Sequence, residues 1–181
     1  MLNKQEIIEK SDRIYEHLIK LPEYKQAKKI IIYCSKDKEV QTDKIIKYSL
    51  LKGKKIIVPI SNTEKRILEF SEIKDFDKEL KISTFNILEP KSEFIRPFNI
   101  NNAHIIICPG VGFDKTGGRL GYGFGYFDKA LNSVNTNIPF VGLAFEIQIV
   151  ESLPLAKNDV KMDLIITENG VIYNNYKYKN H

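Results

Sequence analysis

A glycine-rich stretch over residues 109–128 constrains the fold more than any other part of the sequence. Its sequence is PGVGFDKTGGRLGYGFGYFD, and it holds seven of the ten glycines in the chain. The apolar run 105–108 before it predicts a strand that Pro109 and Gly110 end, and residues 126–134 predict the start of a helix. We therefore expect a long glycine-rich loop between a strand and a helix.

A loop of this kind has two interpretations. Glycine lets the backbone approach a ligand closely, and successive backbone N–H groups beside a helix N-terminus bind anions such as phosphate. On spacing alone a plain connecting loop is equally compatible, because the stretch lacks the Gly-Lys-Ser/Thr of a Walker loop and the third glycine of a dinucleotide fingerprint. Arg119 inside the loop and Asp128 at the predicted helix start favour a metal-bound polyphosphate.

Apolar runs typical of strands alternate with helical patterns along the rest of the chain. Helices are expected at residues 3–20 and 43–51, with Thr42 capping the second and Gly53 ending it. Pro59 is expected to end the strand that follows. The strands are expected at residues 29–33, 55–58, 66–71, 105–108, 140–144, 164–167 and 171–173.

This alternation predicts an α/β domain with a mainly parallel sheet. Ligands of such sheets bind beyond the carboxyl ends of the strands. The segments 34–42 and 109–128, and the segment after residue 144, all follow strands. We therefore expect these three segments to share one cleft.

Length and composition indicate one globular domain, which we place at residues 1–173, with a polar, frayed tail at 174–181. No apolar run is long enough to span a membrane, and the N-terminal sequence is unlike a signal peptide. We therefore expect a cytoplasmic protein without a membrane partner. The net charge of +5 comes mostly from scattered lysines, and no RNA-binding aromatic motif accompanies them, so we also expect no nucleic-acid partner. We expect it to act as a monomer.

The two cysteines and three histidines suggest no metal cluster or disulfide. Cys34 and Cys108 each end an apolar run, which predicts buried, reduced thiols. The histidines are too widely separated for a zinc-type arrangement.

Several motifs together resemble one enzyme family. RLGYGFGYFD after PGVGFD resembles the signature of the 5-formyltetrahydrofolate cyclo-ligases, also called methenyltetrahydrofolate synthetases. EVQT at 39–42 and Glu89-Pro90 are similar to further segments of that family. Residues 148–150, 153–154, 158–159 and 163 fit its C-terminal part. The matches run in the family's order from about residue 11 to residue 168.

The resemblance implies a fold and a reaction. The fold would be a single three-layer, Rossmann-like domain (NagB/RpiA/CoA-transferase-like). The reaction would be the ATP- and Mg²⁺-dependent closure of 5-formyltetrahydrofolate to 5,10-methenyltetrahydrofolate, a ligation that forms a C–N bond and releases ADP and phosphate. The formyl oxygen takes the γ-phosphoryl group, the neighbouring folate nitrogen attacks, and phosphate leaves. The protein would mainly position two substrates and neutralise phosphate charge.

The resemblance also implies residue roles. Asp128 and Asp159 would hold Mg²⁺, which prefers carboxylate and phosphate oxygens. Arg119 and Tyr126 would be catalytic. The folate would contact Cys34, Glu39, Tyr122, Gly123, Phe124, Gly125 and Tyr126. ATP would contact Arg119, Leu120, Gly121, Tyr122, Gly123, Phe124, Gly125, Tyr126 and Phe127.

Each of these residues also has an interpretation without function. Asp128 could favour the first turn of a helix electrostatically, and Asp159 could be a turn residue. Glu39 could be a solvated charge between lysines, and Cys34 a core residue. The whole motif set favours function for Arg119, Asp128 and Glu39, whereas Cys34 alone favours the core and Asp159 is evenly balanced.

Departures from the family pattern support an alternative. The family usually has a basic N-terminal helix that contacts ATP, and the resemblance places no basic residue of this sequence at the matching positions. Phe124 replaces glycine or lysine, Phe127 replaces a tyrosine, and Asn86 replaces a glycine. The alternative is a catalytically weakened paralogue that binds folate or nucleotide. A third hypothesis, an enzyme similar to sugar-phosphate isomerases, would need a general base beside the loop, and the sequence offers no clear one.

Overall fold

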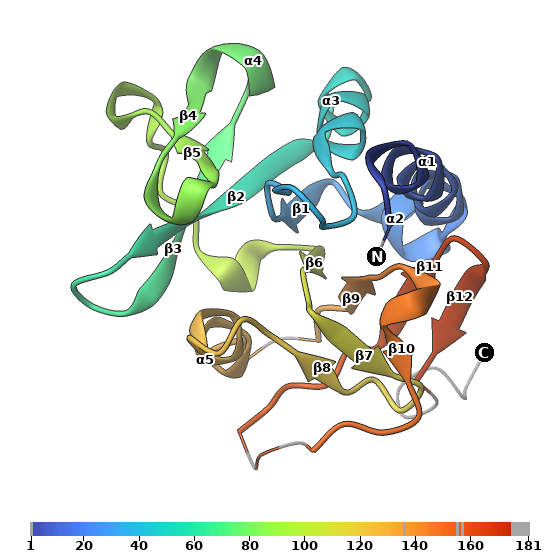
Figure 1. Ribbon diagram of the computed structural model, residues 1–181. Helices are drawn as coiled ribbons and strands as arrows, with labels where there is room; N and C mark the ends of the chain where they lie inside the picture. The colour runs from blue at the N-terminus through green and yellow to red at the C-terminus, as the bar shows by residue number, and fades with distance from the viewer. Residues whose placement is uncertain (1, 136, 155, 157, 175–181) are drawn as a thin grey trace.

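A seven-stranded sheet is the centre of the computed structural model, which describes residues 2–135, 137–154, 156 and 158–174 (Figure 1). Its strand order is β12-β11-β9-β6-β1-β2-β3. The five inner strands run parallel, and the edge strands β3 and β12 are antiparallel to their neighbours, so the mainly parallel sheet is confirmed. The strands are β1 (Lys29–Ile32), β2 (Lys55–Asn62), β3 (Ile67–Ile73), β6 (Ile105–Cys108), β9 (Phe140–Leu143), β11 (Leu164–Thr167) and β12 (Gly170–Tyr173).

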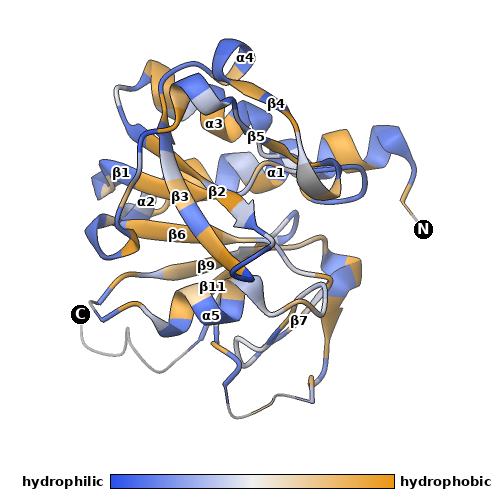
Figure 2. Ribbon diagram, turned by 90° about the vertical axis from the view of Figure 1, so that its left-hand side faces the viewer, coloured by the Kyte–Doolittle hydropathy of each residue, from blue (hydrophilic) through white to orange (hydrophobic). Residues whose placement is uncertain are grey.

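The inner strands bury both of their faces, which produces three layers. Ile30 and Ile32 belong to a core with the helices α1 (Lys4–Lys20), α2 (Pro22–Gln26) and α3 (Asp43–Leu51), whereas Ile31 belongs to a second core with α5 (Tyr126–Asn132). Because side chains alternate along a strand, these cores lie on opposite faces of the sheet. The helices accordingly cover both faces (Figure 1), and the inner strands are coloured as strongly hydrophobic (Figure 2).

Shorter elements complete the chain around the central sheet. A hairpin of β4 (Leu80–Ile82) and β5 (Leu88–Pro90) lies beside β2, and a small sheet of β7 (Gly112–Asp114), β8 (Arg119–Leu120) and β10 (Ile149–Val150) lies within and after the glycine-rich stretch. The others are α4 (Phe76–Glu79) and the 3₁₀ turns Thr84–Asn86, Ser92–Phe94, Ile100–Asn102 and Glu146–Gln148.

Two details predicted from the sequence are wrong. Thr42 precedes α3 as expected, but its side chain does not cap the helix: its hydroxyl donates to the Tyr33 carbonyl at 2.7 Å and accepts from the Ser35 N–H at 3.0 Å. It therefore closes the connection after β1. Pro59 does not end β2, because β1 pairs with β2 only as far as Ile57 and the missing N–H of proline removes no hydrogen bond to β1.

Apart from Asn174, the predicted polar tail lies outside the described residues. In the described part of the chain, no helix is both long and apolar enough to cross a bilayer. Cys34 and Cys108 are free and buried, as predicted.

Two glycines leave room for one buried ring at the start of the glycine-rich stretch. Phe113 is fully buried, and a Cβ at either Gly110 or Gly142 would lie 2.5 Å from its ring. Gly142 is on β9 in the central sheet, so the Phe113 ring packs directly on that sheet. This contact fixes the glycine-rich stretch to the main core.

A buried carboxylate folds the next part of the stretch. Asp114 is 2% exposed, and its Oδ1 accepts hydrogen bonds from the Thr116 N–H, the Thr116 hydroxyl and the Gly118 N–H at 2.8–3.0 Å. Its Oδ2 accepts from the Leu153 N–H at 3.0 Å. Burial raises the pKa of Asp114, but these hydrogen bonds outweigh it and the pKa is lowered. Asp114 therefore acts as an ionised anchor for the turn.

We expect Gly142→Ala to lower the free energy of unfolding by about 1–3 kcal/mol, because the added methyl group overpacks the Phe113 site. Gly112→Ala is the matched control, since its nearest neighbouring atom would be 3.6 Å away. Urea unfolding of both variants measures the difference. Equal stability of the two variants would contradict the role given to Phe113.

We expect Asp114→Asn to lower the free energy of unfolding at neutral pH by about 1–3 kcal/mol, because a buried N–H loses its acceptor. The folded-state pKa of Asp114 is below the unfolded value of about 3.9. The stability that Asp114 contributes is therefore present above that value and is lost as the pH falls through the folded pKa. Denaturant unfolding of both proteins should show the gap narrowing on acidification; a constant gap would refute this assignment.

Candidate active site

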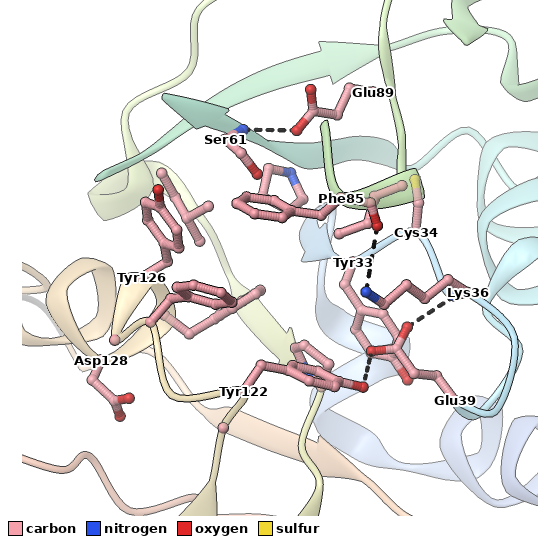
Figure 3. Close-up of a pocket in the computed structure, with 18 of the residues that line it drawn as sticks. Tyr33, Cys34, Lys36, Glu39, Ser61, Phe85, Glu89, Tyr122, Tyr126 and Asp128 are labelled. Carbon is pink, nitrogen blue, oxygen red and sulfur yellow. Dashed lines mark hydrogen bonds between the residues drawn. The ribbon is translucent and has the colours of Figure 1, made fainter. Parts of the chain in front are cut away.

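A cavity of about 210 Å³ opens where β1 and β6 end (Figure 3). The segment after β1 and the glycine-rich stretch after β6 form two of its walls, and residues from β2, β3 and the β4–β5 hairpin form the others. The sequence predicted a cleft shared by the segments 34–42 and 109–128, and the cavity lies between them. The segment after residue 144 does not line it but supports it, since the Gln148 side chain donates to the Gly110 carbonyl at 3.0 Å.

The cavity brings together most of the residues singled out from the sequence. Leu120 on β8 and Gly123 in the loop after β8 do not line the cavity, and Asp159 lies outside it. The predicted residues that line it are Cys34, Glu39, Arg119, Gly121, Tyr122, Phe124, Gly125, Tyr126, Phe127 and Asp128.

A hydrogen bond across the cavity joins its two main walls. The Tyr122 hydroxyl donates to Glu39 Oε1 at 2.5 Å, and the Lys36 backbone N–H donates to Glu39 Oε2 at 2.8 Å (Figure 3). Burial raises the pKa of Glu39, and these two hydrogen bonds oppose the increase. The pKa of Tyr122 is raised by burial and by the same bond to Glu39. Glu39 is thus a partly buried, bonded carboxylate rather than a solvated surface charge.

An ion pair between a buried arginine and a half-buried aspartate lies at the other end of the cavity. Arg119 is 4% exposed; its Nη2 donates to Asp128 Oδ1 at 2.8 Å, and its Nη1 donates to the Pro109 carbonyl at 3.2 Å. Its Nε has no partner among the described residues. The ring of Phe127 lies 5.8 Å from the guanidinium carbon.

The two predicted metal ligands lie on adjoining segments. Asp159 Oδ2 accepts from the Ala156 N–H at 2.7 Å and shapes a turn, and the Val160 N–H that follows lies 3.5 Å from Asp128 Oδ1. Asp128 Oδ2 has no hydrogen-bond partner in the described part of the chain. The described residues contain no group of three or more acidic, histidine or cysteine side chains that could hold a metal ion. A cation here would therefore need further oxygen ligands from water or a bound phosphate.

Three aromatic rings line the cavity between these two ends. Phe85 and Phe124 are 5.4 Å apart between ring centroids, and Tyr126 lies 6.3 Å and 6.2 Å from them. Phe85 and Phe124 are exposed, so flat apolar faces are open to a ligand. The Tyr126 hydroxyl makes no hydrogen bond to the described residues, which leaves it available to a ligand as well.

The loop next to these rings contains two glycines whose role differs from that of Gly110. Gly123 and Gly125 have φ values of +86° and +68°, and a Cβ at either would meet nothing within 4 Å. The left-handed backbone requires glycine or a strained residue there. The open space beside both leaves their backbone accessible to a ligand.

Sequence reasoning missed several lining residues. Lys36, Ser61 and Phe85 line the cavity, but no sequence pattern marked them. Glu89 belongs to the Glu89-Pro90 segment that resembles the family, and this resemblance could have marked it as a residue of the cavity. It is 4% exposed and accepts from the Ser61 N–H at 2.8 Å, so it holds the far end of β2 in place.

Cys34 lines the cavity, and its side chain is buried. Burial raises its pKa to about 12, and the neighbouring carboxylates of Glu89 and Glu39 add to the effect. The thiol is therefore neutral, and it offers a ligand a small apolar contact instead of a nucleophile.

Comparison with known proteins gives a consistent result along nearly the whole chain. The sequence model of the 5-formyltetrahydrofolate cyclo-ligase family matches residues 1–168. A 5-formyltetrahydrofolate cyclo-ligase of Haemophilus influenzae is 35% identical over 156 residues, which cover 84% of this chain and 83% of the relative. A probable 5-formyltetrahydrofolate cyclo-ligase of Caenorhabditis elegans is 28% identical over 181 residues, which cover 94% and 87%.

Solved structures agree with the sequence comparison. The NMR structure of a 5,10-methenyltetrahydrofolate synthetase from Aquifex aeolicus has a TM-score of 0.83 and 30% identity, covering 99% of this chain and 92% of that one. A 5,10-methenyltetrahydrofolate synthetase from Mycoplasma pneumoniae shares the fold with a TM-score of 0.73 at 23% identity. These matches confirm the resemblance predicted from the motifs: the chain belongs to the 5-formyltetrahydrofolate cyclo-ligase family.

Proposed function

We propose that this protein closes 5-formyltetrahydrofolate to 5,10-methenyltetrahydrofolate, using ATP and Mg²⁺ and releasing ADP and phosphate. The observation that carries the proposal is that Glu39 and the Arg119–Asp128 pair line the same cavity. Two substrates must meet for this reaction, and one space bounded by two chemically different ends suits that need.

The folate is proposed to bind at the Glu39 end. An ionised carboxylate has about four acceptor positions, and Glu39 uses two of them for Tyr122 and Lys36. The remaining positions suit the N–H groups of a pterin ring. Phe85 and Phe124 offer exposed faces against which such a ring would stack.

The triphosphate is proposed to lie along residues 119–127. The left-handed, open backbone at Gly123 and Gly125 supports this placement, since bare N–H groups are good phosphate donors. Arg119 adds a positive charge whose position is fixed by Asp128 and Pro109. It would contribute mainly as a preorganised charge, because two of its nitrogens are already bonded.

Asp128 and Asp159 are proposed to hold Mg²⁺. The free Oδ2 of Asp128 and the contact between its Oδ1 and the segment of Asp159 fit such an ion. Mg²⁺ commonly binds through one or two carboxylates together with substrate phosphates and water. When bound, it would offset the charge of the transferring phosphoryl group.

The chemistry then requires little covalent work from the protein. The formyl oxygen takes the γ-phosphoryl group as its bond to ADP breaks, and the neighbouring folate nitrogen attacks the formyl carbon. The C–O bond then breaks as phosphate leaves, and the attacking nitrogen gives up its proton. We assign Tyr126 the role of donating a hydrogen bond to the reacting oxygens, because its hydroxyl lacks a partner in the described chain and its ring lies in the cavity. The rings of Phe85, Phe124 and Tyr126 would exclude water from the bound substrates.

Incubation of the pure protein with 5-formyltetrahydrofolate and Mg-ATP should produce the absorbance of the methenyl product.

Asp128→Asn should lower turnover at limiting Mg²⁺ by about tenfold to a hundredfold, with recovery as Mg²⁺ is raised. Asp77→Asn, which changes an exposed acid on α4, is the matched control. Folate binding without turnover in the wild-type protein would favour the weakened paralogue, and unchanged turnover of Asp128→Asn at limiting Mg²⁺ would remove Asp128 from the metal site.

Tyr122→Phe should move the acidic limb of the pH profile for folate binding to higher pH. The hydrogen bond from Tyr122 lowers the pKa of Glu39 against the effect of burial, so its loss lets the carboxylate protonate at a higher pH. Binding that needs the ionised Glu39 is then lost earlier on acidification. Dissociation constants measured from mildly acidic to neutral pH would show the shift, with Glu39→Gln giving a flat profile. A limb at the same pH in Tyr122→Phe and the wild type would disprove the coupling.

A further inference from the structure

Lys36 places a cation inside the cavity that the roles above do not use. Its Nζ lies 3.4 Å from the Phe85 carbonyl oxygen and 5.3 Å from the centre of the Tyr122 ring (Figure 3). The first contact is at the long limit of a hydrogen bond, and the second is a typical cation–π distance. An ammonium group has three N–H donors, so at least two remain for a ligand.

The charge balance of the cavity distinguishes Lys36 from Arg119. Arg119 forms an ion pair with Asp128, whereas Lys36 forms none with any carboxylate in the described part of the chain. Yet Glu39 is its neighbour in the same turn, because the Lys36 backbone N–H donates to Glu39 Oε2. Both charged groups also contact Tyr122, since the Lys36 ammonium lies over its ring and the Glu39 carboxylate accepts from its hydroxyl (Figure 3). This wall of the cavity therefore presents a carboxylate acceptor and an ammonium donor together, each with unused hydrogen-bonding capacity.

This pairing matches one kind of ring edge. A 2-amino-4-oxo pterin presents the N–H donors of its 2-amino group and N3 next to the acceptor oxygen at C4. A carboxylate satisfies the donors and an adjacent ammonium satisfies the oxygen. A 4-amino ring presents N–H donors at the position of that oxygen, and these would face the ammonium without an acceptor. Once a bound ring covers the ammonium and excludes water, a mismatched analogue leaves polar groups unpaired, which disfavours its binding.

We propose that Lys36 is a specificity-determining residue whose ammonium donates to the 4-oxo group of the folate while Glu39 accepts from its 2-amino and N3–H groups. The cavity then selects 4-oxo pterins over 4-amino pterins. This inference rests on the proposed function, since it takes a reduced folate as the ligand. It adds to that function the reason for a lysine inside the folate end of the cavity.

The test compares the binding of 5-formyltetrahydrofolate and its 4-amino-4-deoxy analogue by isothermal titration calorimetry, without nucleotide. The wild type should prefer the 4-oxo ligand. Lys36→Met should reduce that preference about tenfold or more, by weakening the 4-oxo ligand and sparing or improving the 4-amino one. Lys36→Arg, which keeps a cationic donor, should retain the preference. Lys38→Met is the matched control, because Lys38 is an exposed lysine of the same segment that does not line this cavity.

Three results would overturn the inference, and they can be told apart. An unchanged ratio in Lys36→Met, with normal turnover in the wild type, would refute the role of Lys36 alone. Equal weakening of both ligands would mean that Lys36 senses their shared carboxylate tail instead of the ring edge. Failure of the wild type to bind either ligand would refute the proposed function together with this inference.

Discussion

The rest of the site depends on the hydrogen bonds and ion pair made by the guanidinium of Arg119. It is buried, and it bonds the carbonyl of Pro109 at the end of β6 and the carboxylate of Asp128 in α5. One cation therefore fixes the start of the glycine-rich stretch, its return strand and the helix that follows. A Cβ at Gly121 would lie 3.0 Å from Arg119 Nη1, so a side chain there would require the bonded guanidinium to shift by a few tenths of an ångström. Removal of Asp128 would leave the buried charge of Arg119 uncompensated, which is costly.

The glycines of the stretch fall into two groups according to what surrounds them. Gly110 accommodates the Phe113 ring, and a Cβ at Gly118 would lie 2.4 Å from Asp114 Oδ2, so both serve packing. Gly123 and Gly125 have left-handed backbones and open surroundings, so they serve the loop's shape and its access to a ligand. Some glycines of the stretch are therefore needed for packing alone. The proposal of a phosphate site rests on Gly123 and Gly125.

Much of the fold could be predicted from the sequence because buried parallel strands are continuous apolar runs. The runs at 105–108 and 164–167 match β6 and β11. The positions of the segments 34–42 and 109–128, directly after predicted strands, already implied a cleft where β1 and β6 end. What could not be predicted depends on neighbours distant in sequence. The continuation of β2 through Pro59 depends on where β1 ends, and the position of Phe85 depends on the β4–β5 hairpin beside β2. Lys36 looked like one of many surface lysines, and only its place over Tyr122 brings it into the cavity.

Backbone hydrogen–deuterium exchange with and without Mg-ATP tests the central claim most directly, because it reports on the loop amides themselves. We expect Mg-ATP to slow exchange across residues 121–126, where the left-handed glycines leave the backbone open, and 5-formyltetrahydrofolate to slow it around Glu39. Protection by Mg-ATP confined to other segments, with residues 121–126 exchanging as fast as in the free protein, would contradict the proposal that this loop holds the triphosphate.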